Sequence, residues 1–441
     1  MDSSKADFDV VIIGLGVAGS LLAYNLARSG FKVAGLEKGE KGYVRTVWTN
    51  EIPIDTLKSS LLSDSELIYE VMPETMAVLK QSGETAFYID VRRFVKAIDM
   101  EAFVKNYRNA ASKLGAKLMY NSEFTGLRAN PDNVVCVFKE GKKEFSIESR
   151  FVVDCSGVGS IIRRDIFKDQ FSEADFIFAY RYKYNVHPKK IKRFWCNRRL
   201  ADGSAVLSLS EQGGFNTIAI YPNVDEGLVD ILCGGSDRNI QKRIAEIVRR
   251  EFNILKKPLM GGGGIIPIRR PFLRIYENRV FSIGDSASMV YPFCASGVST
   301  IINASEILID ALKRDDPYSY QRNFNLLISR KYAFMAFLRR IIEESDKDEA
   351  RLLFELFINQ VTIKHVFGNK DVLTPENVLL SLFKIPLLFK RPSLLKKFAI
   401  YLLAGGLSSV LYYFGHEKDV KPIDLAFIES RLPKLFERLR L

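Results

Sequence analysis

The sequence predicts an α/β fold combined with a separate antiparallel sheet and a helical carboxy-terminal region. Three observations lead to this prediction. Residues 10–37 have the pattern strand, glycine turn, helix, strand; residues 176–184 alternate strictly between two kinds of side chain; and the chain beyond residue 315 has helical periodicity. A chain of 441 residues is long enough for two or three such units.

Residues 10–37 predict a Rossmann-like dinucleotide-binding unit. A β-branched apolar strand breaks at Gly14, Gly16 and Gly19, a helix follows, and a second strand ends at Glu37. The first glycine permits a tight turn, the second lets the backbone approach a pyrophosphate, and the third lets the helix pack on the strand. The helix N-terminus offers free N–H groups to the phosphates, and Glu37 stands where a carboxylate accepts hydrogen bonds from a ribose diol.

The next segments are expected to complete this unit. Lys38 and Arg45 belong to a basic loop that either contacts the adenosine phosphates or faces solvent. Arg92 starts an expected helix and is expected to reach the cofactor. The expected helices cover 64–83 and 91–114, and expected strands near 117–128, 133–139 and 143–148 form a β-meander.

Two later segments again run from a strand into a glycine turn. One contains Gly157; in the other a strand meets Gly284 and Asp285, and a helix begins near Gly297. A run of four glycines at 261–264 indicates either a close approach of backbone or hinge freedom.

In this order and spacing, the three glycine-containing elements resemble those of FAD-dependent proteins of the aromatic hydroxylase fold. Within that group the chain looks most like the geranylgeranyl reductases, over roughly residues 8–330. The resemblance implies reduction of C=C bonds in a long isoprenoid lipid of geranylgeranyl type. It implies an FAD-binding domain at 1–165 and 265–330, an antiparallel substrate domain at 166–264 and a helical region at 331–441.

The resemblance also implies which residues hold FAD. Asp285 would bond the ribityl hydroxyls, and the helix after Pro292 would lie beside the isoalloxazine. The expected cofactor-binding residues are Gly14, Gly16, Gly19, Glu37, Lys38, Arg45, Arg92, Gly157, Gly284, Asp285, Gly297 and Val298. No metal is expected.

The chain departs from the reductase pattern in three places. The region that corresponds to the family's Pro-Cys-Gly element reads GYVRTVWTNEIP and has no cysteine, the substrate-sheet motif appears only as GFNTIAIYP, and Ala295-Ser296-Gly297 replaces Gly-x-Gly. Alternatives therefore stay open: a flavin monooxygenase of the same fold, a carotenoid-cyclase-like protein, or a flavoprotein with altered chemistry.

Tyr221 and Cys294 are the candidate proton donors. Cys294 lies just before the helix that begins near Gly297, whose N-terminus would lower the thiol pKa, and the alternative is a small packing residue. The aromatic row from Phe176 to Tyr184 either packs in the core or forms a wall for a large apolar ligand.

Charge and cysteine content indicate possible partners. The formal net charge of +12 implies attraction to an anionic surface, but no signature of nucleic-acid binding accompanies it. The five dispersed cysteines fit a reducing cytoplasm. Because the sequence has one dinucleotide fingerprint, electrons are expected from transiently bound NAD(P)H or from a small redox protein.

The carboxy-terminal third combines apolar and basic residues. Ser345 and Asp348 suggest a helix capping box, and residues 398–415 carry no charge. These helices either close over the substrate domain or contact the inner face of a membrane peripherally. The cations expected at such a contact are Lys384, Lys390, Arg391, Lys396 and Lys397.

Overall fold

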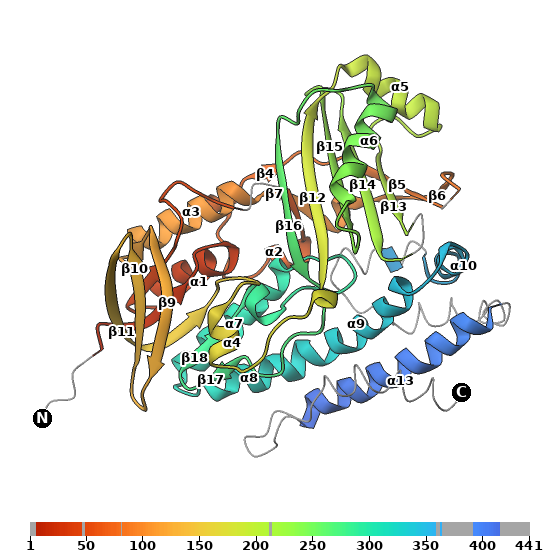
Figure 1. The fold of residues 1–441 in the computed structure, drawn as a ribbon. Helices are drawn as coiled ribbons and strands as arrows, with labels where there is room; N and C mark the ends of the chain where they lie inside the picture. The colour runs from red at the N-terminus through yellow and green to blue at the C-terminus, as the bar shows by residue number, and fades with distance from the viewer. Residues whose placement is uncertain are drawn as a thin grey trace, which may run out of the picture.

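Two large β-sheets and a layer of helices make up the fold (Figure 1). The computed structural model describes residues 6–45, 49–80, 82–210, 214–358, 362–363 and 391–414. The expected class is confirmed: an α/β unit, an antiparallel unit and a helical carboxy-terminal region.

The first sheet has the parallel core that the sequence predicts. Strand β1 (Phe8–Ile13) pairs in parallel with β2 (Val33–Leu36) and with β11 (Lys143–Asp154). The sheet order is β17-β18-β11-β1-β2-β8, where the remaining members are β8 (Lys117–Met119), β17 (Tyr276–Glu277) and β18 (Val280–Ser282). The carboxyl ends of β1, β2, β11 and β18 therefore meet at one edge, where open α/β sheets bind ligands.

Helices cover one face of this sheet and a β-ribbon covers the other. The helices are α1 (Val17–Arg28), α3 (Met100–Lys113) and α7 (Val298–Lys313), which share one apolar core with the sheet. On the opposite face, β10 (Val134–Glu140) pairs with the first half of β11, and β9 (Ser122–Ala129) pairs with β10, as the predicted meander requires.

The second sheet stands beside the first and has seven strands (Figure 1). Its order is β16-β12-β15-β14-β13-β5-β6. The strands are β5 (Thr75–Leu79), β6 (Thr85–Asp90), β12 (Phe176–Asn185), β13 (Ala205–Leu209), β14 (Asn216–Asn223), β15 (Leu228–Gly235) and β16 (Met260–Pro267). Two helices, α5 (Pro188–Arg198) and α6 (Ile240–Phe252), share a core with one face of it.

The expected helix at 64–83 is wrong. This stretch contains a 3₁₀ turn η1 (Asp64–Glu66), β4 (Tyr69–Glu70) and β5, which pairs with β13 on one side and β6 on the other. Residues 76–79 are a continuous buried apolar run, as a strand covered on both faces requires. Residues 75–90 thus belong to the second sheet, although the sequence places them in the FAD-binding domain; the other expected domain limits stay predictions.

The expected helix at 91–114 is right only in its second half. It opens with η2 (Val91–Arg93) and β7 (Val95–Asp99), and α3 begins at Met100. The helix cannot extend further back because the Asp99 side chain caps it, accepting a hydrogen bond of 2.9 Å from the N–H of Ala102.

A small three-stranded sheet joins the two large ones. It consists of β7 between β3 (Thr49–Pro53) and β4, and α2 (Ile54–Leu57) follows β3. The side chains of β3 and β4 reach the second sheet through ion pairs described below.

The carboxy-terminal helices lie beneath both sheets in Figure 1. They are α8 (Tyr318–Phe324), a π-helical turn η5 (Asn325–Ser329), α9 (Arg330–Glu343), α10 (Lys347–Phe357) and α13 (Pro392–Phe414), which packs along α9. The capping box of α10 is formed by Asp346 and Glu349, so the expected pair of Ser345 and Asp348 is wrong by one residue. In the part of the chain described here, no helix is long and apolar enough to cross a bilayer.

The four-glycine run serves close approach. It lies in β16, where a Cβ on Gly263 would come 2.6 Å from the carbonyl oxygen of Ala179 and 2.1 Å from the ring of Tyr180. A Cβ on Gly264 would meet nothing within 4 Å.

The two neighbouring glycines make a matched test. We expect Gly263→Ala to lower the free energy of unfolding by about 1–3 kcal/mol, because backbone and ring must move apart. Gly264→Ala should leave stability unchanged or slightly higher, since alanine also reduces the entropy of the unfolded chain. Thermal or denaturant unfolding of the two variants measures the difference, and equal stabilities would contradict the close-approach explanation.

Candidate active site

One large cavity lies between the first sheet, the second sheet and the carboxy-terminal helices. Its volume is about 1790 Å³, and apolar surface dominates its lining. Pockets for drug-sized ligands measure about 300–1,000 Å³, so this cavity has room for more than one ligand. It begins at the carboxyl ends of β1, β2 and β18.

The first two glycines of the turn after β1 border this cavity. A Cβ on Gly14 would lie 2.7 Å from the carbonyl oxygen of Cys155, whereas a Cβ on Gly16 would meet nothing within 4 Å. Gly19 does not border the cavity; a Cβ there would lie 1.9 Å from the carbonyl oxygen of Gly14, so only glycine lets α1 pack this closely. The open space at Gly16 is the cradle that a pyrophosphate needs.

Glu37 is held in place by the backbone. The N–H groups of Leu15 and Gly39 each donate a hydrogen bond of 2.9 Å to its two carboxylate oxygens. Arg108 adds an ion pair of 3.6 Å and itself donates to the carbonyls of Leu15 (2.9 Å) and Tyr43 (2.8 Å). Burial lowers the pKa of Arg108 while Glu37 acts in the opposite direction. The fixed carboxylate borders the cavity where a ribose diol would bind.

Of the three basic residues expected at the cofactor, two border the cavity. Lys38 and Arg45 line it, but Arg92 does not. The guanidinium of Arg92 donates to the carbonyl of Met72 (3.1 Å) and to Glu74 (2.8 Å), at the edge of the second sheet. The expected role of Arg92 is therefore wrong: its guanidinium is bound to Met72 and Glu74 and lies outside the cavity lining. Arg108, which sequence reasoning missed, lies beside Glu37 instead.

The expected flavin end of the cavity contains an open carboxyl group. Gly157, Gly284, Asp285, Gly297 and Val298 all line the cavity there, and α7 begins at Val298. Burial raises the pKa of Asp285 to about 6, against the effect of Arg45. Within the described residues, the Asp285 carboxyl accepts no hydrogen bond and faces the cavity, so it has capacity for the hydroxyls of a ribityl chain.

The turn that carries Gly157 is fixed by a buried aspartate. The carboxyl of Asp154 accepts hydrogen bonds from the Ser156 N–H (3.0 Å) and hydroxyl (2.6 Å) and from the Ser160 hydroxyl (2.5 Å). These bonds position the backbone at Ser156 and Gly157 against the cavity.

The aromatic row of β12 packs in the core. Phe178, Tyr180 and Tyr182 contact the cluster that α5 and α6 form with the second sheet, so core packing is the alternative that the structure supports for most of this face. The opposite face lines the cavity instead, through Ile177, Ala179 and Arg181. Alternation along a strand shows that two faces exist but not which one meets a helix. Tyr180, whose ring lies against Gly263 of β16, is the residue of the aromatic row that also borders the cavity.

The two candidate proton donors both line the cavity. Burial raises the pKa of Tyr221 well above its ordinary value, and the negative charge of Glu51 acts in the same direction. Burial also raises the pKa of Cys294 to about 12. The Cys294 side chain is nevertheless open to the cavity, so the expected effect of the helix N-terminus on its pKa stays a prediction.

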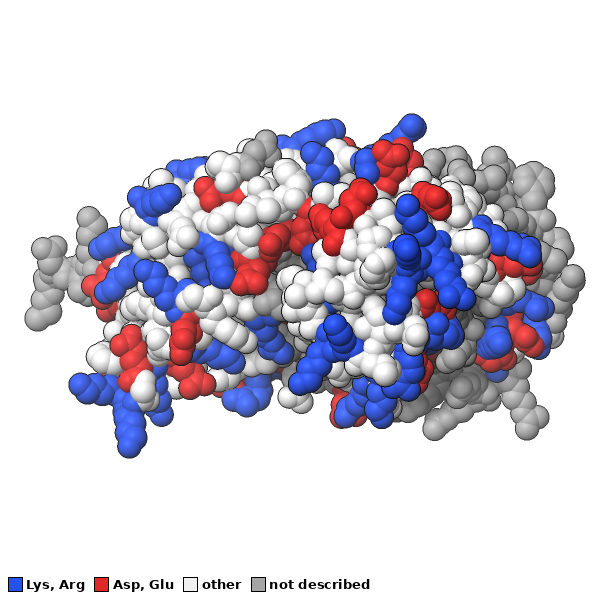
Figure 2. All heavy atoms as spheres, turned by 90° about the horizontal axis from the view of Figure 1, so that it is seen from above, with Lys and Arg blue, Asp and Glu red and all other residues white. Residues whose placement is uncertain are grey.

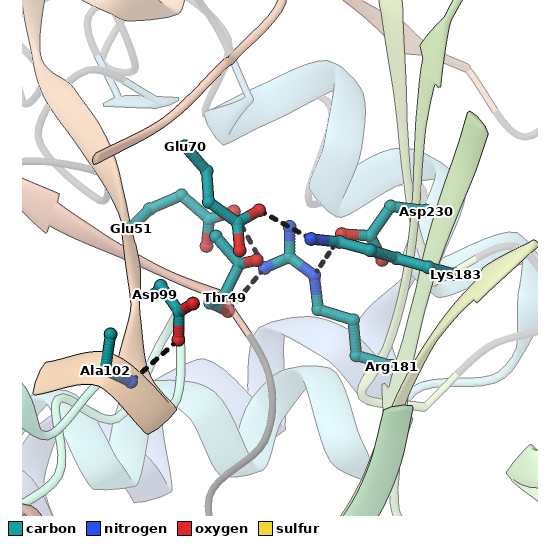
Figure 3. A network of polar contacts seen from close by, with 8 residues as sticks. All are labelled: Thr49, Glu51, Glu70, Asp99, Ala102, Arg181, Lys183 and Asp230. Atoms are coloured by element: carbon teal, nitrogen blue, oxygen red, sulfur yellow. Dashed lines mark hydrogen bonds and ion pairs between the residues drawn. The ribbon is translucent and has the colours of Figure 1, made fainter. Parts of the chain in front are cut away.

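A buried ion-pair network crosses from the second sheet to the small sheet (Figure 3). The guanidinium of Arg181 donates to Asp230 (2.9 Å), to Glu51 (2.9 Å) and to the carbonyl of Thr49 (2.7 Å). It also lies over the ring of Tyr221, with 4.9 Å between its central carbon and the ring centroid. The side chains of Arg181, Glu51 and Asp230 are 7%, 15% and 10% exposed, so the network is nearly dry. A second pair, Lys183 with Glu70 (2.6 Å), lies next to it.

Sequence reasoning missed Glu51 and Asp230 and gave Arg181 no role. The one local signal was a charged residue, Arg181, on the same strand face as Ile177 and Ala179. Strand register brings the other residues to Arg181. Tyr221 pairs directly with Asp230, and Arg181 pairs with Leu232, so the side chains of Tyr221, Asp230 and Arg181 lie on the face of the second sheet that is turned toward the cavity.

The far arm of the cavity is apolar. Residues of α9, α10 and α13 line it, together with two residues beyond α10: Leu338, Ile341, Ile342, Leu353, Phe354, Phe357, Ile358, Ile363, Phe398 and Leu402. The cavity thus joins a polar end at the first sheet to an apolar end among the helices.

Comparison with known proteins identifies the family. The family described as FAD binding domain matches residues 7–313. The chain belongs to this FAD-binding family. The expected cofactor, FAD, is confirmed, and so is the enzyme class, an FAD-dependent oxidoreductase that resembles geranylgeranyl reductases.

Individual proteins show the same likeness. A digeranylgeranylglycerophospholipid reductase of Methanocaldococcus jannaschii is 22% identical over 402 residues, which is 86% of this chain and 97% of the relative. A geranylgeranyl bacteriochlorophyll reductase-like protein of Thermoplasma acidophilum has a similar fold, with a TM-score of 0.69 at 16% identity over 89% of this chain and 99% of that one. CtdE, solved with FAD and a substrate, has a TM-score of 0.61 at 16% identity over 88% and 100% of the two chains.

The glycine cradle makes a direct prediction. Gly16→Leu should abolish FAD binding, because its side chain would fill the open space beside the turn. Gly42→Leu is the control, since Gly42 is exposed and a Cβ there meets nothing within 4 Å. Absorbance after purification measures the flavin content per protein in both variants. A yellow Gly16→Leu protein would contradict the assignment of Gly16 to the pyrophosphate site.

A second prediction concerns Asp285. Asp285→Ala should weaken FAD affinity by about tenfold or more, since a hydrogen bond to a charged group contributes about 1.5–3 kcal/mol. Its unfolding temperature without FAD should change little, because the carboxyl accepts no hydrogen bond from the described residues. Fluorescence titration of the apoprotein with FAD gives the affinity, and an unchanged dissociation constant would remove Asp285 from the site.

Proposed function

We propose that this chain reduces C=C bonds of a long isoprenoid lipid of geranylgeranyl type. The observation that carries the proposal is the continuity of the cavity, from the glycine cradle and Asp285 to the apolar arm among α9, α10 and α13. A cavity of about 1790 Å³ holds a dinucleotide and leaves space for a second large ligand, and the apolar arm suits a hydrocarbon chain.

Different residues of this chain would hold the two halves of FAD and the lipid. Gly14, Gly16 and Glu37 would hold the adenosine half of FAD, and Asp285 the ribityl chain. When reduced, FAD supplies a hydride for the double bond. The apolar arm excludes water and aligns the isoprenoid chain beside the flavin end.

A reduction of C=C also needs a proton. Tyr221 and Cys294 line the cavity, and both keep their protons at neutral pH because burial raises their pKa values. They are therefore weak acids. Electrons would come from NAD(P)H bound transiently or from a small redox protein, as the single dinucleotide site suggests.

The proposed reaction has a decisive test. The dithionite-reduced protein, mixed without oxygen with a digeranylgeranylglycerophospholipid, should return to the oxidised flavin spectrum, and mass spectrometry should find a product heavier by two hydrogens per bond reduced. Turnover that requires oxygen would identify a monooxygenase instead, and no turnover under either condition would contradict both.

The apolar arm should set the preferred chain length. Leu353→Trp places a larger side chain in the arm, so reduction of a lipid with C20 chains should fall about tenfold or more while that of a C10 analogue changes little. Leu327→Trp, on an exposed position outside the cavity, is the control. Rates for both lipids give the ratio; equal losses would show that the arm does not hold the chain.

We further propose that the protein works at the cytoplasmic face of a membrane, without crossing it. Two of the cations expected there are already paired, Arg391 with Asp348 (2.7 Å) and Lys397 with Glu349 (2.7 Å), and Lys384 and Lys390 lie outside the described residues. On the upper face, seen in Figure 2 and opposite the carboxy-terminal helices, the cations are interspersed with acidic residues. Contact would therefore depend more on the exposed leucines of α13: Leu402, Leu403 and Leu407.

Binding to vesicles tests this contact. Full-length protein should co-sediment with anionic liposomes, and Leu403→Ser with Leu407→Ser should weaken binding more than Lys396→Glu does, because apolar burial resists salt and charge attraction does not. Sedimentation at low and high salt compares the three proteins. A wild-type protein that stays in the supernatant at low salt would contradict the membrane contact.

A further inference from the structure

Helix α13, which runs beneath α9 in Figure 1, carries two stripes of side chains with different surroundings. One stripe lines the apolar arm of the cavity and consists of Leu395, Phe398, Ala399 and Leu402. The other contains Ser393 and Lys397, which lie four residues apart, outside the cavity lining, and hydrogen-bond where α9 ends and α10 begins. The helix is thus a wall of the arm that is fastened by a different face.

Glu349 of α10 accepts hydrogen bonds from both fastening residues. Its side chain is only 3% exposed; one carboxylate oxygen accepts from the Ser393 hydroxyl (2.6 Å) and the other from the Lys397 ammonium group (2.7 Å). The same carboxylate accepts from the N–H of Asp346 (3.3 Å) in the capping box of α10. One buried group therefore joins the first turn of α10 to α13.

Both charges of this pair suit the helix ends at which they lie. Lys397 also donates to the carbonyl of Glu344 (2.6 Å), the residue that caps the C-terminus of α9, where a cation is favoured. Glu349 lies in the first turn of α10, the end that favours a negative charge. Burial raises the pKa of Glu349, but the bonds from Lys397 and Ser393 outweigh it, so the pKa is lowered and the carboxylate is charged at neutral pH.

The arm begins directly beside this joint. Ala350, which follows Glu349, borders the cavity, and so do Phe357 of α10 and Phe398 of α13, whose ring centroids are 5.4 Å apart. The α10 and α13 walls of the arm therefore meet along their lengths. Apolar contacts of this kind permit sliding, whereas hydrogen bonds to one carboxylate are directional and fix one arrangement of the two helices.

We propose that Glu349 is a positioning residue for the lipid: through Ser393 and Lys397 it holds α13 against α10 and so keeps the apolar arm preformed for an isoprenoid chain. A preformed site binds more tightly, because the free energy of ordering it is not lost on binding. This role rests on the proposed function, which assigns the arm to the lipid.

Lys397→Met tests the joint without touching the cap of α10. Equilibrium binding of a radiolabelled digeranylgeranylglycerophospholipid to the oxidised holoprotein, in non-ionic detergent, gives the dissociation constant. It should rise about tenfold or more, which corresponds to about 1.4 kcal/mol or more. Lys397→Arg keeps a cation and its N–H donors and should restore most of the affinity. An unchanged constant in Lys397→Met would overturn the proposal.

A milder variant covers the case in which Lys397→Met does not fold. Ser393→Ala removes one hydrogen bond to Glu349 and leaves the ion pair, so the dissociation constant of the lipid should rise about threefold or more. A wild-type constant in Ser393→Ala would also contradict the role of Glu349.

Arg391→Met is the matched control. Arg391, just before α13, pairs with Asp348 of α10 (2.7 Å), but the two side chains are 45% and 58% exposed, and exposed pairs contribute little. The variant loses the same charge as Lys397→Met, yet its dissociation constant should stay within about twofold of the wild type. Equal losses in the two variants would assign the effect to charge alone and overturn the role of Glu349.

Kinetics separates positioning from general damage. In single turnovers of the dithionite-reduced protein without oxygen, Lys397→Met should need more lipid for half-maximal flavin reoxidation. The maximal rate and the FAD affinity should stay at wild-type values, because Glu349, Ser393 and Lys397 do not border the cavity. A fall in either would indicate lost structure and overturn the positioning role.

The two measurements also distinguish this role from the proposed function. If the wild type binds the lipid but does not reduce it, and Lys397→Met binds it more weakly, the proposed function fails and the role of Glu349 stands. If the lipid is reduced but Lys397→Met binds it as the wild type does, the function stands and the role of Glu349 fails.

Discussion

The arrangement of the cavity depends on Arg181. This one guanidinium, projecting from the second sheet, holds Glu51 and the carbonyl of Thr49 on the small sheet and Asp230 on the neighbouring strand. Burial alone would lower the pKa of Arg181, but Asp230 and Glu51 raise it above its ordinary value, so the cation is permanent. Through it the small sheet, which leads back to the first sheet by β7 and α3, is fixed against the second.

Stability does not account for this network. Removing two charges from water costs several kcal/mol per ion, and well-packed apolar residues often stabilise a core as much or more. The unpaired oxygen of Asp230 adds to the cost. Such a cluster is best understood from its position, between a polar cavity end that fits a dinucleotide and an apolar arm that fits a hydrocarbon. A charge placed there acts on a bound substrate in surroundings of low dielectric, where its effect is larger than in water.

The sequence predicts well whatever depends on neighbours along the chain. The glycine turn, Glu37 and the Gly284-Asp285 turn before α7 are each encoded within a few dozen residues. The errors lie where distant pairing decides: residues 76–79 form a strand because β13 and β6 pair with them. The Arg181 network joins residues 49–51, 181 and 230 by strand register, and Arg108 meets Glu37 only because α3 packs on α1. No local pattern contains these contacts.

Burial favours one kind of chemistry over another in this cavity. Loss of water to the surrounding protein raises the pKa of Cys294 to about 12, although its side chain is exposed to the cavity. The same loss of water raises the pKa values of Asp285, to about 6, and of Asp230, so carboxyl protons persist closer to neutral pH than usual. A cavity that retains carboxyl protons suits the proposed addition of a proton and a hydride. Because apolar ligands displace further water, occupation of the arm strengthens this bias.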